Sequence, residues 1–436
     1  MSNRSFLNDI LRRVSRQALP KRNIIESAEV DLSTLCNHLL DNQSEASGLI
    51  MARQILDRFR ELTEDQTTEF FQHIASDLGP DDDAINQAIA GWTAGSQDAA
   101  RRLHFATEPR SQELIRILNR VPGATEHLVA MRAALLTRLK DHPELAGLDL
   151  DFQHLFASWF NRGFLEIRRI DWSTSAAILE KIIEYEAVHE ISGWDDLRRR
   201  VGDTDRRLFA FFHPAMPAEP LIFVEVALTV AVPDAIAPIL SENRKRCEPE
   251  AAVTAVFYSI SNCQAGLRGI SFGNFLIKQV VTELQRELPD LSTFVTLSPV
   301  PGLRRWIDEA IENNDPLLDD RARLMLNSLS DQEVPSEAFC KFATAVYLTQ
   351  AKRPNGSAYD PVAHFHLGNG AELYGIHANA DLSARGIDNS WGVMVNYLYA
   401  SDRIDLNHQT YSAHQKVAAS AQVLGLVAGR KGQNDV

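Results

Sequence analysis

Apolar residues recur at helical spacing through the first third of the chain, where no segment alternates convincingly as a strand would. The clearest run places six of them on one face: Leu49, Ile50, Ile55, Leu56, Phe59 and Leu62. Thr63 and Gln66 form a capping-box pattern, which predicts a further helix that ends at Gly79-Pro80. Two more amphipathic helices are predicted over residues 111–119 and 124–141. Together these runs predict a helical bundle over residues 1–157.

The pattern changes near Trp159, where short apolar runs begin to mix with helical periods. Strands are predicted over residues 208–212, 221–232, 253–261, 293–297 and 372–377. Helices are predicted over residues 173–186, 194–201, 272–288, 316–329 and 336–349. The strand at 253–261, the helix at 272–288 and the strand at 293–297 form a βαβ unit. The predicted fold class is therefore α and α/β, with the helical bundle followed by one mixed α/β domain over residues 158–436.

The N-terminal residues 5–19 have an apolar helical face and a basic side formed by Arg12, Arg13 and Arg16. A mitochondrial transit peptide has this composition, and so does a first amphipathic helix that packs on its own domain. We favour the packed helix, and with it a cytoplasmic location over the mitochondrial matrix. The segment has no secretory apolar core, and the C-terminal residues do not form a peroxisomal Ser-Lys-Leu signal.

Composition excludes several classes of partner. Apolar residues make up 45% of the 436 residues, the usual share for a globular protein, and no apolar run approaches the roughly 18–20 residues that span a bilayer. The net charge of −14 argues against a nucleic-acid surface. The four cysteines form no CxxC pair, and the histidines and cysteines show no metal-ligand spacing. We therefore expect reduced thiols, no metal and no membrane partner.

A glycine-bearing loop follows the strand at 253–261 and opens the next helix. Glycine lets backbone N–H groups approach a ligand closely, and a helix N-terminus favours an anion, so this order is typical of a phosphate site. The candidate binding residues are Arg268, Gly269, Ile270, Ser271, Phe272, Gly273 and Asn274. Short glycine patterns also occur in turns that bind nothing, and that interpretation remains open at this point.

Three side chains further along the chain are candidates for chemistry. Ser298 ends the strand at 293–297 and precedes a stiff Pro-Val-Pro-Gly turn, although a lone serine there is more often a turn residue. In the segment 360–371, His364 and His366 would share one face if the segment is extended. Such a pair can bind a metal, yet no acidic or cysteine ligand stands nearby, so His366 is either a core side chain or a general acid/base with a pKa near neutrality. Tyr399 is a candidate pocket wall or hydrogen-bond donor.

The loop resembles the pyrophosphate loop of the GNAT acetyltransferases, whose pattern is Arg/Gln-x-x-Gly-x-Gly/Ala. Arg268 and Gly273 match this pattern, whereas Ser271 stands at the first glycine. Four segments in order, FYSISNCQAGLRGISFGNFLIKQVVTELQ, LSPVPG, DPVAHFHLGNGAELY and ADLSARGIDNSWGVMVNYLY, resemble the malonyl-CoA decarboxylase family. The resemblance is close over about residues 155–400 and looser over the helical half.

This resemblance implies a GNAT-like catalytic domain that converts malonyl-CoA to acetyl-CoA and CO2 without a metal or an organic cofactor. It implies that the helical domain makes oligomer contacts and that the protein is a homotetramer built as a dimer of dimers. By motif, the family's catalytic serine falls on Ser298, its catalytic histidine on His366 and not His364, and its CoA loop on 268–274.

Our hypothesis is that His366 gives a proton to carbon, while Ser298 hydrogen-bonds the malonyl carboxylate or carbonyl. Two other functions compete with this reading. A GNAT-type acyltransferase would move an acyl group from CoA to an amine, and a non-enzymatic scaffold would bind CoA without turnover. Malonyl-CoA supplied without an acceptor distinguishes them, because only the decarboxylase releases CO2 from it.

Overall fold

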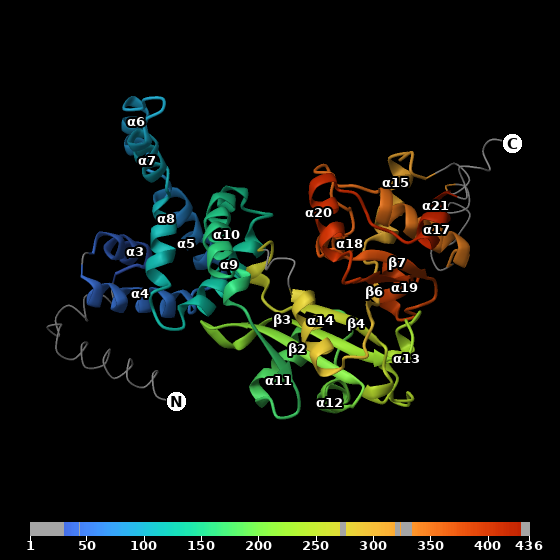
Figure 1. The fold of residues 1–436 in the computed structure, drawn as a ribbon. Coiled ribbons are helices and arrows are strands. Elements are labelled where there is room, and N and C mark those ends of the chain that lie inside the picture. The colour runs from blue at the N-terminus through green and yellow to red at the C-terminus, as the bar shows by residue number, and fades with distance from the viewer. Residues whose placement is uncertain (1–29, 43, 271–275, 319–322, 324–333, 429–436) are drawn as a thin grey trace. The chain divides into compact units, whose positions relative to one another are not determined.

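The structure is a computed structural model, and it describes residues 30–42, 44–270, 276–318, 323 and 334–428. These residues divide into two compact units. The first holds the helices up to Leu165, together with His213–Pro217 and the loop that begins at Gln264, and the second holds the remaining residues. Figure 1 shows the helices of the first unit in blue to green and the sheet of the second in green to red.

The first unit is helical throughout its described part before Leu165. Its α-helices are α3 (Leu32–Asp41), α4 (Glu45–Phe59), α5 (Glu64–Asp77), α6 (Asp82–Ala90), α7 (Gln97–Ala106), α8 (Arg110–Leu118), α9 (Ala124–Arg138) and α10 (Ala146–Trp159). The predicted capping box is confirmed, because Thr63 caps the start of α5 and Gln66 bonds back to the Thr63 N–H. Phe70, Phe71 and Ile74 then face the core of the unit. The helices predicted at 111–119 and 124–141 correspond to α8 and α9.

The second unit is built on a mixed sheet, which has eight strands within the described residues. The strands are β1 (Glu166–Ile170), β2 (Arg206–His213), β3 (Met216–Thr229), β4 (Thr254–Asn262), β5 (Thr293–Thr296), β6 (Ser298–Pro299), β7 (Glu372–His377) and β8 (Met394–Leu398). Their order is β1-β2-β3-β4-β5-β8-β6, and β7 pairs with β8. All five strands predicted from the sequence are present.

The βαβ unit is confirmed, because β4 and β5 pair in parallel from Thr254↔Thr293 to Phe257↔Thr296. Beyond Phe257, β4 continues along β3 as far as Asn262. The segment that follows β5 turns instead toward β8, where Ser298 of β6 pairs with Val395. The parallel pairing of β4 and β5 therefore ends just before Ser298, and this serine lies just beyond the carboxyl end of β5.

Helices cover the sheet and complete the second unit. They are α11 (Ala176–Tyr185), α12 (Trp194–Gly202), α13 (Ala237–Leu240), α14 (Leu276–Glu287), α15 (Leu303–Glu312), α17 (Glu337–Gln350), α18 (Pro361–Gly368), α19 (Ala384–Ser390), α20 (Ile404–His414) and α21 (Ala421–Ala428). In Figure 1, α11 and α12 lie below β2 and β3, and their apolar faces form one core with the sheet through Ile182, Leu197, Leu208 and Phe212. No helix within the described ranges is long and apolar enough to cross a membrane.

Three predicted segments lie wholly or partly outside the described residues. They are the amphipathic segment 5–19, the first residues of the helix predicted at 272–288, and most of the helix predicted at 316–329. The described remainder of the second of these is α14, which starts at Leu276.

Candidate active site

His366 lies on helix α18, so the condition under which it would share a face with His364, an extended segment, is not met. Asp360 caps the helix by accepting the N–H of Ala363 at 2.8 Å, and Pro361 occupies the first turn. Two positions apart on a helix point in different directions. His364 therefore faces the Tyr411 hydroxyl, 2.9 Å from its Nδ1, while His366 faces the sheet. The two histidines do not form a pair.

Ser298 and His366 lie within hydrogen-bond distance in the interior of the second unit. The Ser298 Oγ is 3.2 Å from His366 Nε2, and the Ser298 hydroxyl donates to Thr296 Oγ1 at 2.9 Å. Both side chains are buried, with 6% of Ser298 and 3% of His366 exposed. The sequence did not single out Thr296, although its place two residues before Ser298 along an extended chain puts both on one face.

Tyr399 completes this group from the end of β8. Its hydroxyl lies 2.8 Å from His366 Nδ1, the only hydrogen-bond partner that the described residues offer it. A buried phenol donates its proton to such an acceptor, so Nδ1 accepts and the ring proton sits on Nε2, where it points at Ser298. The result is a relay in which Tyr399 donates to His366, His366 to Ser298, and Ser298 to Thr296.

Burial sets the charge state of this relay. Desolvation lowers the pKa of His366 from its ordinary 6.5 to about 3, so the imidazole is neutral at pH 7 in the free protein. The sequence had suggested a pKa near neutrality. Burial also raises the pKa of Tyr399 far above its usual value, which keeps the phenol protonated. Tyr397 stacks on the imidazole with ring centroids 4.5 Å apart, and its own hydroxyl is buried without a partner among the described residues.

The glycine-bearing loop belongs to the first unit, so the structure describes it separately from the serine–histidine pair. A short 3₁₀ turn, Ala265–Leu267, precedes Arg268, Gly269 and Ile270. Gly269 has a φ of +81° with open space where a Cβ would stand, and Arg268 is exposed. Ser271, Phe272, Gly273 and Asn274 lie outside the described residues.

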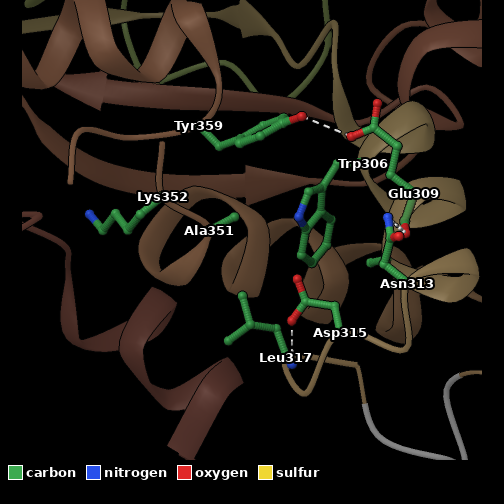
Figure 2. Close-up of a pocket in the computed structure, with 9 residues that line it drawn as sticks. Trp306, Glu309, Asn313, Asp315, Leu317, Ala351, Lys352 and Tyr359 are labelled. Carbon is green, nitrogen blue, oxygen red and sulfur yellow. Dashed lines mark hydrogen bonds between the residues drawn. The ribbon is translucent and has the colours of Figure 1, made fainter. Parts of the chain in front are cut away.

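Within the described residues, no group of three or more His, Cys, Asp and Glu side chains is arranged to hold a metal ion. A hollow of about 240 Å³ in the second unit is lined by Trp306, Glu309, Asp315, Lys352 and Tyr359 together with neighbouring residues. In Figure 2 the Tyr359 hydroxyl donates to the Glu309 carboxylate, at 2.8 Å. None of the residues that the sequence singled out lines this hollow.

The fold and the buried pair define a class, an α/β protein with a buried serine and histidine within hydrogen-bond distance of each other. Residues 163–435 match the malonyl-CoA decarboxylase C-terminal domain, and residues 78–160 match the malonyl-CoA decarboxylase N-terminal domain. The chain therefore belongs to the malonyl-CoA decarboxylase family, whose name is that of a carboxy-lyase.

Individual relatives agree with this assignment. The chain is 32% identical to the mitochondrial malonyl-CoA decarboxylase of Mus musculus over 83% of this chain and 82% of that protein. Its structure is similar to that of malonyl-CoA decarboxylase from Rhodopseudomonas palustris, with a TM-score of 0.85 and 49% identity over 90% of this chain and 98% of the other. It is also similar to malonyl-CoA decarboxylase from Agrobacterium vitis, with a TM-score of 0.85 and 47% identity over 91% of this chain and 99% of the other. The predicted fold class, α and α/β with N-terminal helices followed by a mixed α/β part, is confirmed.

Proposed function

We propose that this protein decarboxylates malonyl-CoA to acetyl-CoA and CO2, with Ser298 and His366 as its catalytic residues. The observation that carries the proposal is the 3.2 Å contact between Ser298 Oγ and His366 Nε2 in a chain of this family. Loss of CO2 breaks the bond between the carboxylate and the methylene carbon, and the electron pair passes to the thioester as an enolate. A proton must then reach that carbon, so the reaction consumes one proton in total.

The relay supplies the two functions that this chemistry needs. A hydroxyl such as that of Ser298 can donate a hydrogen bond to the thioester oxygen or to the malonyl carboxylate, and an oxyanion donor typically contributes about 3–4 kcal/mol to transition-state stabilisation. His366 can deliver the proton to carbon, directly or through the Ser298 hydroxyl. The imidazole is neutral in the free protein, but a substrate carboxylate beside it raises the pKa of His366. The histidine then takes up a proton when the substrate binds, and this proton is the one delivered to carbon.

Further parts of the proposal rest on the resemblance. Residues 268–274 bind the CoA pyrophosphate, and Tyr399 helps to bind malonyl-CoA through the histidine that it orients. The thioester itself receives the electron pair, so the reaction as proposed uses side chains alone, with no metal or organic cofactor.

We also propose a cytoplasmic homotetramer built as a dimer of dimers. Light scattering that gives a mass of 48.7 kDa, that of one chain, at micromolar concentration would contradict the tetramer.

The test is the release of CO2 and acetyl-CoA from malonyl-CoA without any acceptor, in the wild type and in the variants Ser298→Ala and His366→Asn. Both variants should fold, as judged by circular dichroism, and both should lose about a hundredfold or more in kcat. If both keep a kcat near that of the wild type, the catalytic assignment is wrong. Acyl transfer that appears only when an amine is added would point to the acyltransferase, and CoA binding without any turnover would point to the scaffold.

A further inference from the structure

Tyr347 of α17 lies where the segments that carry Ser298 and His366 meet. Ser298 is followed by a turn that ends at Gly302, and His366 lies on α18, which starts after its capping residue Asp360. Tyr347 is fully buried, and its hydroxyl donates to Asp360 Oδ2 at 3.3 Å. The same hydroxyl lies against Gly302, since a Cβ built on this glycine would be 2.4 Å from it. One phenol therefore contacts both the turn and the start of the helix.

The turn needs glycine at position 302 because of this contact and not because of its backbone. Gly302 has a φ of −109°, which is outside the left-handed region that favours glycine. The space for a Cβ is instead occupied by the hydroxyl oxygen of Tyr347, at 2.4 Å. The next nearest atoms, Tyr347 Cζ and Asp360 Oδ2, lie at 3.5 and 3.7 Å, which are ordinary contact distances. The hydroxyl is therefore the group that a larger residue at this position would displace.

Asp360 fixes the orientation of this hydroxyl. Its two oxygens have separate tasks, because Oδ1 accepts the N–H of Ala363 in the first turn of α18 and Oδ2 accepts the proton of Tyr347. Burial and the nearby carboxylate raise the pKa of Tyr347 far above its usual value, so the phenol stays protonated and continues to donate. Trp306 of α15 packs on the phenol ring with centroids 5.1 Å apart. The ring is thus also held by the helix that follows the turn.

We propose that Tyr347, held by Asp360, is a positioning residue for the decarboxylation. Its hydroxyl sets the distance between the turn after Ser298 and the helix that carries His366, and hence the contact between these two side chains. This inference rests on the proposed function, because it takes the two side chains to be catalytic. A pair that is held at its working distance before the substrate binds needs no rearrangement during the reaction.

The test is the effect of Tyr347→Phe on the release of acetyl-CoA from malonyl-CoA, in the wild type and in His366→Asn. The change removes the hydroxyl and keeps the ring on Trp306. We expect kcat to fall about tenfold in the wild-type background, with KM within about twofold, since the pair is displaced and the binding of substrate is not. In the His366→Asn background kcat should fall by less than about twofold, because no imidazole is left to position. General damage to the fold would lower kcat by the same factor in both backgrounds.

The matched control is Tyr359→Phe. Tyr359 belongs to the same aromatic group, with its ring centroid 6.1 Å from that of Tyr347, but its hydroxyl donates to Glu309 of α15. Its loss should leave kcat within about twofold of the wild type.

A second pair of variants tests the contact itself. Gly302→Ala alone places a methyl group 2.4 Å from the hydroxyl oxygen of Tyr347 and should lower kcat about tenfold or more. Added to Tyr347→Phe, it should cause no further loss, since the oxygen is gone and the nearest remaining atom lies at 3.5 Å.

A kcat of Tyr347→Phe near that of the wild type overturns the inference. So does an equal fall in the two backgrounds, an equal fall in Tyr359→Phe, or a full further loss when Gly302→Ala is added to Tyr347→Phe. Each of these results leaves the decarboxylase assignment standing. A wild type that releases no CO2 from malonyl-CoA, or a His366→Asn variant with the kcat of the wild type, removes the proposed function and this inference with it.

Discussion

The Ser298 Oγ lies 3.2 Å from the Nε2 of His366, although 68 positions separate the two residues in the chain. Strand β8 explains how they meet. It pairs with β6 at Ser298↔Val395, and one residue past its end it places Tyr399 against the other ring nitrogen of His366. The same short strand therefore fixes both neighbours of the imidazole, and the geometry of the pair depends on residues that do not themselves react.

The first prediction concerns Tyr399→Phe. This change removes the donor that holds Nδ1 as an acceptor, so the ring proton is no longer confined to Nε2 and the imidazole is no longer oriented toward Ser298. We expect kcat for malonyl-CoA to fall about a hundredfold, with a smaller change in KM. Steady-state kinetics measure both quantities, and circular dichroism establishes that the variant is folded.

The matched control is Tyr411→Phe. The Tyr411 hydroxyl also bonds a histidine of α18, His364, at 2.9 Å, and it accepts the N–H of Ala358. This change should lower the free energy of unfolding by about 1–2 kcal/mol and leave kcat near that of the wild type. Equal losses of kcat in the two variants would show that the loss reflects damage to α18 and not the relay.

The second prediction concerns stability in acid. Burial lowers the pKa of His366 from 6.5 to about 3, so between these values the unfolded chain binds a proton that the folded protein does not. The stabilisation from the neutral imidazole is therefore complete above about pH 6.5 and is lost progressively as the pH falls toward 3. One such proton changes the free energy of unfolding by about 1.4 kcal/mol per pH unit.

This dependence is measured as a difference between two proteins. Denaturant unfolding of the wild type and of His366→Asn at pH 7, 6 and 5 gives the free energy of unfolding for each. The wild type should lose more of it below about pH 6 than the variant does, by up to about 1.4 kcal/mol per pH unit. Two other buried groups, His189 with a lowered pKa and Glu225 with a raised one, occur in both proteins and cancel in the comparison. Parallel curves would contradict the prediction.

The elements that the sequence predicts are those whose signals are local. Thr63 and Gln66 lie three residues apart, and this local pair predicts the start of α5 without any information on tertiary contacts. The strand and the helix around residues 253–288 can also be predicted from local signals, because the spacing of their apolar residues indicates β4 and α14 directly. The motif around Ser298 likewise placed this serine at a strand end, as the structure does.

What the sequence missed depends on contacts between distant residues. The sequence analysis left the conformation around His364 and His366 open, although Asp360-Pro361 is a helix-start signal and does begin α18. Nothing near Arg132 in the sequence reveals its contacts with Asp149 of α10 and with the carbonyl of Gly266. The lowered pKa of His366 was also out of reach, because burial is a property of the whole fold.

The third prediction contrasts two glycines of one loop. Gly266→Ala places a methyl group 1.9 Å from the Val129 carbonyl oxygen, which belongs to the backbone of α9 and cannot rotate away. We expect it to lower the free energy of unfolding by about 3 kcal/mol. Gly269→Ala meets no atom, but a φ of +81° is strained for alanine and should lower the same quantity by about 1 kcal/mol.

Denaturant unfolding of both variants decides between these effects. The order of the two losses is the informative result, because both changes add the same methyl group within four residues of each other. If Gly269→Ala proves the more damaging, the close approach of Gly266 to α9 does not hold in solution.

The fourth prediction is that substrate binding is accompanied by proton uptake. His366 is neutral in the free protein at pH 7, since burial lowers its pKa to about 3. A negative group brought next to the imidazole raises that pKa, and a pKa raised above 7 makes the histidine take a proton from the buffer.

The probe is a malonyl-CoA analogue with a sulfonate in place of the carboxylate, because it keeps the charge and cannot lose CO2. Calorimetric binding enthalpies at pH 7 in buffers of different ionisation enthalpy should give a slope of about one proton taken up by the wild type. His366→Asn should bind the analogue with a slope near zero. A wild type that binds the analogue with no proton uptake would show that His366 does not face the negative end of the substrate, and would leave the proton for the enolate to come from another group.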